Sequence, residues 1–93
     1  MTSCGARSAN PGLTVRLYER PDCHLCDEAF DELEALRAEG LGFEVERIDI
    51  ESDEGLLRRY LERIPVVELG GEVVSELGLD EGALRRRLAT LST

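Results

Sequence analysis

Lysine and tryptophan are absent from this 93-residue chain, and histidine occurs only once. The lack of lysine excludes chemistry that depends on an amine, such as a Schiff base or the lysine of a phosphate-binding loop. No apolar run approaches the roughly 20 residues that span a bilayer. The first 12 residues also lack the apolar core of a secretory signal peptide. We therefore expect a cytoplasmic protein with no membrane partner.

Basic residues are few. Eleven arginines oppose 20 aspartates and glutamates, so the formal net charge is −9. A surface this acidic repels phosphate groups, which argues against binding nucleic acid. The longest basic run, Arg85 to Arg87, is interpreted as the solvated face of a helix, whose C-terminal half favours cations.

The length leaves room for one small domain, and 42% hydrophobic residues is typical of a folded protein. We interpret residues 1–12 as a disordered leader, in which Cys4 is a bystander, and residues 13–93 as the domain. Alternation of period two predicts strands, and spacing of three to four predicts helices. The predicted strands are 13–18, 43–50, 65–69 and 72–75, and the predicted helices are 23–37, 54–64 and 81–91.

These elements follow the order β-α-β-α-β-β-α. The first two strands, joined through a helix, should be parallel, and the Gly70-Gly71 pair predicts an antiparallel hairpin. Helices should cover both faces of a mixed four-stranded sheet. In the second strand the apolar pattern slips at Glu46-Arg47, which indicates either a bulge or two partly covered faces. Pro65 should end the second helix.

The motif Cys23-His24-Leu25-Cys26 directly follows a strand and opens a helix. Residues three apart share one face of a helix, so the two sulfurs can meet. Backbone N–H groups and the helix dipole favour a thiolate at Cys23, which should lower the pKa of that thiol below its ordinary value. Cys26 lies on the apolar stripe one turn later and can resolve a mixed disulfide. This is the geometry of thiol–disulfide exchange.

Two neighbours could tune the nucleophile. Arg20 lies three residues before Cys23 and could reach its sulfur, and His24 is an exposed modulator. The alternatives for the motif are half of a metal site or two inertly packed cysteines. A zinc site needs about four ligands, and His24 and Cys4 are the only further candidates. We therefore expect no metal.

The stretch from Leu17 to Cys26 resembles the active-site segment of glutaredoxin-like proteins of the thioredoxin superfamily. The segment Arg63-Ile64-Pro65-Val66-Val67 resembles the cis-proline segment of that superfamily. More narrowly, the two segments together resemble a small bacterial glutaredoxin-like family. The resemblance covers about residues 13–91 and implies an α/β thioredoxin-like fold of the glutaredoxin type.

The resemblance also implies roles for single residues. Cys23 would be the nucleophile and Cys26 the resolving thiol. Pro65 would be cis, and the backbone of Ile64 would pair with a peptide-like substrate. Arg20 matches the basic residue before the glutaredoxin motif, and the N–H of Val66 could hold the glycine end of glutathione.

The chain departs from the family pattern where many glutaredoxins place Gly-Gly after the fourth strand to hold the other end of glutathione. Ser75-Glu76 stands there, and Glu76 would repel a carboxylate. We expect no bound cofactor. Glutathione is a candidate co-substrate, but weak glutathione use is expected.

These observations predict a monomeric thiol–disulfide oxidoreductase that reduces disulfide-containing proteins or small-molecule disulfides. A dithiol reductase or glutathione would be its electron donor. Two alternatives belong to other classes: a scaffold that holds a metal or an iron–sulfur cluster through Cys23, and a non-catalytic interaction module. The absorbance spectrum separates the first, because a cluster is coloured and a dithiol is not.

Overall fold

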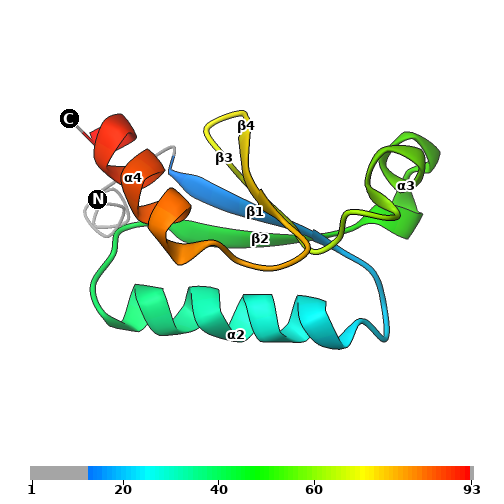
Figure 1. Ribbon diagram of the computed structural model, residues 1–93, viewed down its shortest axis with the longest axis horizontal. Helices are drawn as coiled ribbons and strands as arrows, with labels where there is room; N and C mark the ends of the chain where they lie inside the picture. The colour runs from blue at the N-terminus through cyan, green and yellow to red at the C-terminus, as the bar shows by residue number, and fades with distance from the viewer. Residues whose placement is uncertain (1–12, 93) are drawn as a thin grey trace, which may run out of the picture.

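The computed structural model describes residues 13–92, so the predicted leader and Cys4 lie outside the described residues. A four-stranded sheet has the order β2-β1-β3-β4. As predicted, β1 and β2 are parallel, and β3 and β4 form an antiparallel hairpin. Figure 1 shows α2 running along the sheet and α3 at one end of it. The elements are β1 (Thr14–Glu19), α2 (His24–Ala38), β2 (Glu44–Asp49), η1 (Ile50–Ser52), α3 (Glu54–Tyr60), β3 (Val66–Leu69), β4 (Glu72–Glu76) and α4 (Glu81–Ser92).

One face of the sheet is covered by α2 and α4. Apolar side chains of β1 and β3 alternate toward these helices and join their apolar stripes in one cluster. Burial of such side chains is the main favourable contribution to folding. The buried members are Val15, Leu17, Ala29, Leu33, Leu36, Phe43, Val67, Leu69, Leu84 and Leu88.

The opposite face is covered only at the α3 end. There Tyr18, Ile50, Tyr60 and Val66 form a second cluster, with the two tyrosine rings 4.7 Å apart between centroids. Burial raises the pKa of the Tyr18 phenol above its ordinary value. Helices therefore cover both faces, as expected, but unequally.

The second strand has no bulge, because β1 and β2 pair in regular register from Thr14–Glu44 to Glu19–Asp49. The slip in its apolar pattern arises because Val45 packs on the first cluster and Ile48 on the second. The irregularity in the sheet lies instead between Val67 and Glu68, in the pairing with β4.

The helix predicted to reach Ile64 ends at Tyr60. The N–H groups of Arg63 and Ile64 both donate to the Tyr60 carbonyl, at 2.8 and 3.1 Å, and these bonds close the helix with a tight turn. The residue before a proline avoids helical dihedrals, so Ile64 leaves the helix. Leu61, the residue after the last helical one, is 41% exposed.

The hairpin turn is fixed by Gly70 and Gly71, with φ of +65° and +82°. Two successive positive φ angles match the right-handed twist of paired strands. A Cβ on Gly70 would also lie 2.8 Å from Cδ1 of Leu91, so a larger residue there would displace that side chain. Arg87 of α4 donates to the carbonyl groups of Leu69 and Gly70, both at 3.1 Å, and so joins the turn to the last helix.

Candidate active site at the amino end of α2

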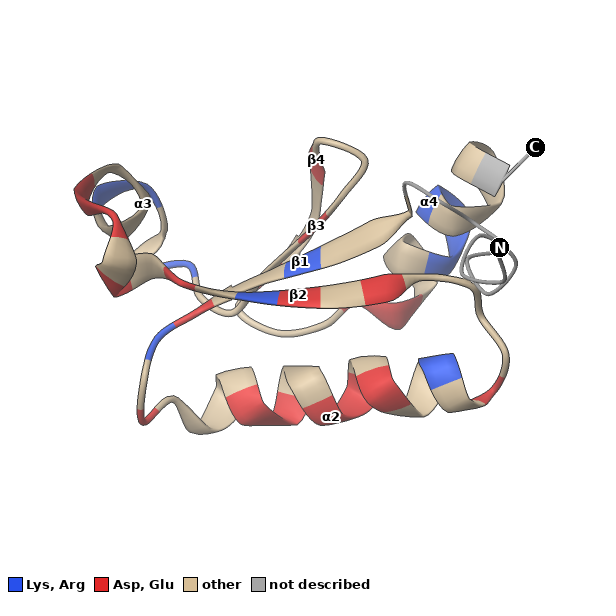
Figure 2. Ribbon diagram, turned by 180° about the vertical axis from the view of Figure 1, so that it is seen from behind, with Lys and Arg blue, Asp and Glu red and all other residues tan. Residues whose placement is uncertain are grey.

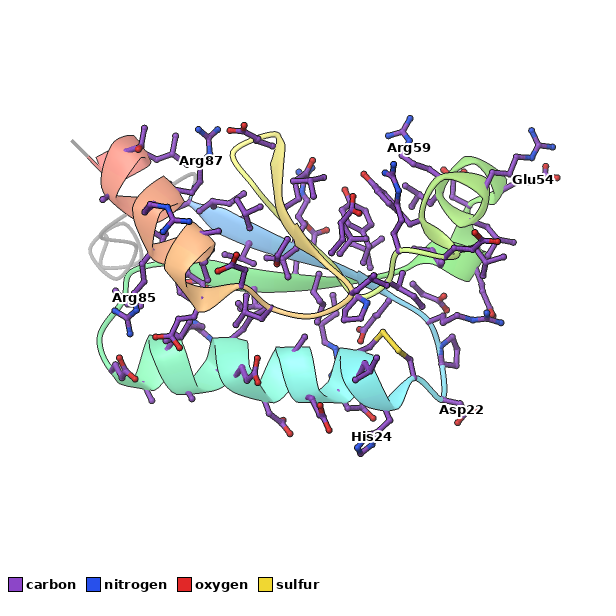
Figure 3. The ribbon with its side chains drawn as sticks, in the orientation of Figure 1. Asp22, His24, Glu54, Arg59, Arg85 and Arg87 are labelled. Atoms are coloured by element: carbon purple, nitrogen blue, oxygen red, sulfur yellow. A yellow bond between two sulfur atoms is a disulfide. The ribbon has the colours of Figure 1, made fainter. Side chains whose placement is uncertain are left out.

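Cys23 and Cys26 form a disulfide at the start of α2 (Figure 3). Cys23 is the N-cap: its backbone is extended, with φ −108° and ψ 106°, and its sulfur accepts a hydrogen bond from the N–H of Cys26 at 3.1 Å. The first N–H groups of a helix have no partner within the helix, and the dipole adds positive potential there. The Cys23 sulfur therefore lies where negative charge is stabilised.

The two sulfurs differ in access. Cys26 is fully buried, whereas Cys23 is half-buried. An attacking thiolate needs access to its target, and a resolving thiol needs only to reach its neighbour. The difference matches the roles that the resemblance implies for the two cysteines.

Three loops meet at this end of the sheet. Tyr18 pairs with Val66, and Val66 pairs with Glu76. The register therefore places three segments together: the loop after β1, the loop before β3 and the loop after β4. The first carries Cys23, and the second carries Ile64 and Pro65.

The peptide bond between Ile64 and Pro65 is cis. Pro65 and Val66 are buried, and Ile64 is half-buried. The loop after β4 is tied to this segment, because the N–H of Leu77 donates to the carbonyl of Arg63 at 2.9 Å. The side chain of Arg63 pairs with Glu76 at 3.5 Å.

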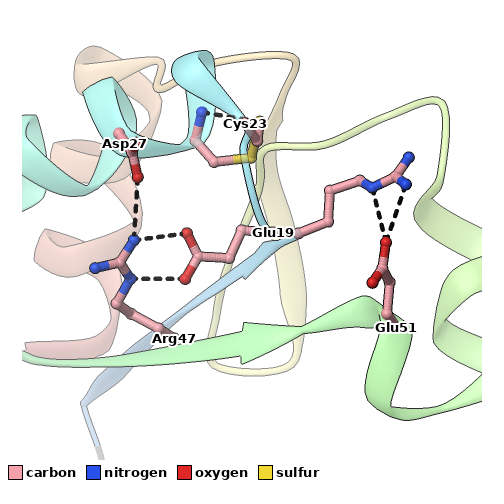
Figure 4. The surroundings of a disulfide bond; sticks show 7 residues. Glu19, Cys23, Asp27, Arg47 and Glu51 are labelled. Atoms are coloured by element: carbon pink, nitrogen blue, oxygen red, sulfur yellow. Dashed lines mark hydrogen bonds and ion pairs between the residues drawn. A yellow bond between two sulfur atoms is a disulfide. The ribbon is translucent and has the colours of Figure 1, made fainter.

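The two predicted modulators of Cys23 have carboxylate partners. Arg20 pairs with Glu51 of η1 at 2.9 Å (Figure 4), so its guanidinium group is engaged there. His24 is 86% exposed and its Nε2 lies 2.9 Å from Glu28. Figure 3 shows the His24 side chain on the outer side of α2, away from the sheet.

An arginine that the sequence pattern did not single out lies close to the disulfide. Arg47 of β2 forms two bonds with Glu19, at 2.6 and 2.9 Å, and a longer one with Asp27 at 3.5 Å (Figure 4). Its guanidinium carbon also lies 4.0 Å from the centre of the Phe30 ring. Glu19 is only 13% exposed. Hydrogen bonding to Glu19 raises the pKa of Arg47 above its ordinary value, which keeps it charged.

Within residues 13–92, no three His, Cys, Asp or Glu side chains are placed to hold a metal ion. No helix in this part of the chain is long and apolar enough to cross a membrane.

Several solved structures are similar to this chain. Protein Ne2328 from Nitrosomonas europaea is 27% identical with a TM-score of 0.75, over 94% of this chain and 98% of that one. Protein XcR50 from X. campestris is 35% identical with a TM-score of 0.62, over 82% and 96%. A mutant thioredoxin from Halobacterium salinarum is 24% identical with a TM-score of 0.62, over 96% and 81%. No curated protein matches the sequence.

The fold is thus thioredoxin-like, as the resemblance implied. Residues 14–89 match the family model described as Glutaredoxin-like domain (DUF836). Together with the Cys23–Cys26 disulfide, this match supports a thiol–disulfide redox function in general terms. The chain belongs to this glutaredoxin-like family of the thioredoxin superfamily.

Proposed function

We propose that this protein is a thiol–disulfide oxidoreductase whose Cys23 attacks disulfides of proteins or small molecules. One observation carries the proposal: the Cys23 sulfur caps a helix N-terminus, accepts the N–H of Cys26, and is bonded to a cysteine that is fully buried. A half-buried sulfur in that position is both reachable and stabilised as a thiolate.

The reaction starts from the reduced form. The Cys23 thiolate attacks one sulfur of the substrate disulfide, a new bond joins Cys23 to that sulfur, and the other half leaves as a thiolate that takes a proton. Cys26 then loses its proton and attacks the Cys23 sulfur, which releases the second half of the substrate as a thiol. The substrate gains two electrons and two protons, and the protein ends as the Cys23–Cys26 disulfide.

The division of roles is tested with Cys23→Ser and Cys26→Ser. In a Cys4→Ser background, we expect iodoacetamide at pH 6 to modify the single remaining thiol faster in Cys26→Ser than in Cys23→Ser, because only Cys23 caps the helix. Cys26→Ser should also accumulate a mixed disulfide when its Cys23 thiolate attacks the disulfides of intact insulin or of partner proteins, because no second thiol is present to release the trapped half. Faster modification of Cys26 than of Cys23 would contradict the assignment.

We further propose that a dithiol reductase, rather than glutathione, is the better electron donor. A glutathione site must hold two carboxylates, and Glu76 stands at the end of β4 with its partner Arg63. Replacing Glu76 by glycine removes that charge and frees Arg63 for a carboxylate.

We therefore expect Glu76→Gly to reduce a glutathionylated peptide severalfold faster than wild type with glutathione as the donor. The rate of loss of the glutathione adduct is the measurement. The control is Glu72→Gly, which removes a carboxylate from the other end of the same strand. A fast wild-type rate that Glu76→Gly leaves unchanged would contradict the proposal.

A further inference from the structure

Leu25 and Leu77 are the two most exposed large apolar side chains of residues 13–92, at 52% and 64%. Leu25 lies between the two cysteines. Leu77 follows β4, in the loop that is hydrogen-bonded to Arg63 beside the cis-proline segment. In both Figure 3 and Figure 4 the turn after β4 passes beside the disulfide. The start of α2 and the loop after β4 therefore each bring an exposed leucine to the end of the sheet that carries the disulfide.

The backbone at Leu77 is strained. Its φ is +63°, a left-handed conformation that is unfavourable for a residue with a Cβ. Asp22, just before Cys23, is the one other described non-glycine residue with positive φ, at +61°. Aspartate can offset such a conformation with local hydrogen bonds, but leucine cannot. Leu77 contributes little to the core either, because its side chain is mostly exposed.

A strained backbone that holds an apolar side chain in water adds nothing to the stability of the fold. Such outliers gather where a protein contacts a ligand. Two exposed leucines around a nucleophile form an apolar rim, and a rim of this kind is complementary to an apolar side chain next to the atom under attack.

Charge around the leucine rim favours a cationic partner. The guanidinium groups of Arg20, Arg47 and Arg63 at this end of the sheet are all engaged with carboxylates. Four carboxylates lie close to the two leucines along the chain: Asp22, Asp27, Glu28 and Glu76. Asp27 and Glu76 are paired with Arg47 and Arg63, whereas among the described residues Asp22 and Glu28 have no arginine partner, so the local excess of charge is negative.

We propose that Leu25 and Leu77 bind a polypeptide disulfide that carries a large apolar side chain next to the attacked cysteine and basic residues farther away. This inference rests on the proposed thiol–disulfide exchange and specifies its substrate. The apolar side chain packs between the two leucines while the Cys23 thiolate attacks the neighbouring sulfur. Glutathione, which is anionic and lacks an apolar side chain, fits this surface poorly.

The test uses three nine-residue peptides, each a symmetrical dimer linked by one disulfide. The first has leucine beside the cysteine and lysines farther out, the second replaces leucine by serine, and the third replaces the lysines by glutamates. Rates of reduction by the pre-reduced protein are compared with the rate for 2-hydroxyethyl disulfide, which has neither feature. We expect the first peptide to react about tenfold faster than the second, the advantage of partly burying one leucine. We expect the third peptide to be reduced most slowly at low salt and to show the largest increase in rate when salt is added.

Leu77→Asn and Leu25→Gln should each lower the leucine-to-serine rate ratio toward one. Asparagine accepts positive φ, and the ratio measured within one variant does not depend on how much of the sample is active. The matched control is Val73→Thr, which changes an exposed apolar residue nearer the hairpin turn and should keep the wild-type ratio.

Suppose that the wild-type protein reduces 2-hydroxyethyl disulfide but reduces the leucine and serine peptides at equal rates. That result would reject the binding role of Leu25 and Leu77 and would leave the proposed function standing. The binding role would also be rejected if Leu77→Asn and Leu25→Gln both kept the wild-type ratio of the two peptide rates. Failure to reduce any of the four disulfides would reject the proposed function, and the substrate proposal with it.

Discussion

Arg47 pairs with two carboxylates close to the Cys23–Cys26 disulfide. Its guanidinium group holds Glu19 at the end of β1 and Asp27 in the first turn of α2. Negative charge near a thiol disfavours the thiolate and raises its pKa. Under the proposed mechanism, an arginine of a different strand thus favours the Cys23 thiolate without touching it.

We expect Arg47→Met to raise the pKa of the Cys23 thiol and to slow its alkylation at pH 6 about threefold, an effect typical of one charge lost at intermediate distance. Arg47→Lys keeps the charge and should keep most of the wild-type rate. Alkylation is measured from pH 4 to 9 in a background with both Cys4→Ser and Cys26→Ser, in which Cys23 is the one thiol of the chain. If Arg47→Met and Arg47→Lys gave the same titration curve, charge would not be the reason for the effect.

Arg47 and Leu77 were identified only from the structure, and in each case there is a physical reason why the sequence pattern does not reveal them. Cys23, Cys26 and Pro65 are readable from the sequence because they form short motifs with local geometry. Arg47 meets Glu19 only through the parallel register of β1 and β2, and Asp27 only through the packing of α2 on that sheet. Leu77 was not singled out because left-handed dihedrals at leucine run against its own preference.

At the scale of elements, Arg87 links the last helix to the hairpin turn. Its side chain is 23% exposed and also pairs with Glu72 at 3.1 Å. The run Arg85 to Arg87 was predicted to be a solvated helix face. That is right for Arg85 and Arg86, which are exposed, and wrong for Arg87, whose Nε and Nη2 donate to backbone carbonyls.

Arg87→Met should lower the free energy of unfolding by about 1–2 kcal/mol, the loss expected for charge-assisted hydrogen bonds to partly buried carbonyls. Arg86→Met, on the exposed side of the same helix, should change it by less than about 0.5 kcal/mol. Urea denaturation followed by circular dichroism measures both variants. An equal loss in the two would show that helix charge matters and the turn contact does not.

Elements with strong local signals were predicted well. The first strand, the long helix, the Gly70-Gly71 hairpin and the last helix all occur close to their expected limits. The last helix begins where the Asp80 side chain accepts the N–H of Ala83 at 3.0 Å. The end of α3 was wrong by four residues, because the turn at Tyr60 depends on backbone bonds that carry no side-chain pattern. The second strand was ambiguous since its two apolar residues pack on different faces.

For the whole molecule, the excess of nine negative charges opposes compaction. Surface ion pairs offset little of this, because exposed pairs are typically worth about 0–1 kcal/mol and are screened by salt. In Figure 2 the acidic residues lie along the outer side of α2, and many of the basic residues lie on α3 and α4.

We expect the free energy of unfolding at pH 7 to rise by roughly 0.5–1 kcal/mol between 20 mM and 300 mM NaCl, because screened repulsion outweighs the screened pairs. Urea, an uncharged denaturant, is the suitable probe on the oxidised protein. A fall in stability with salt would mean that the ion pairs dominate.

The sheet ends in two open strands, β2 and β4, and each exposes backbone groups that a neighbouring molecule could extend. Both strands carry exposed carboxylates: Glu44, Glu46 and Asp49 on one, Glu72 and Glu76 on the other. Two copies meeting edge to edge along either strand would bring acid against acid. The acidic edges therefore discourage continuous intermolecular sheets at neutral pH.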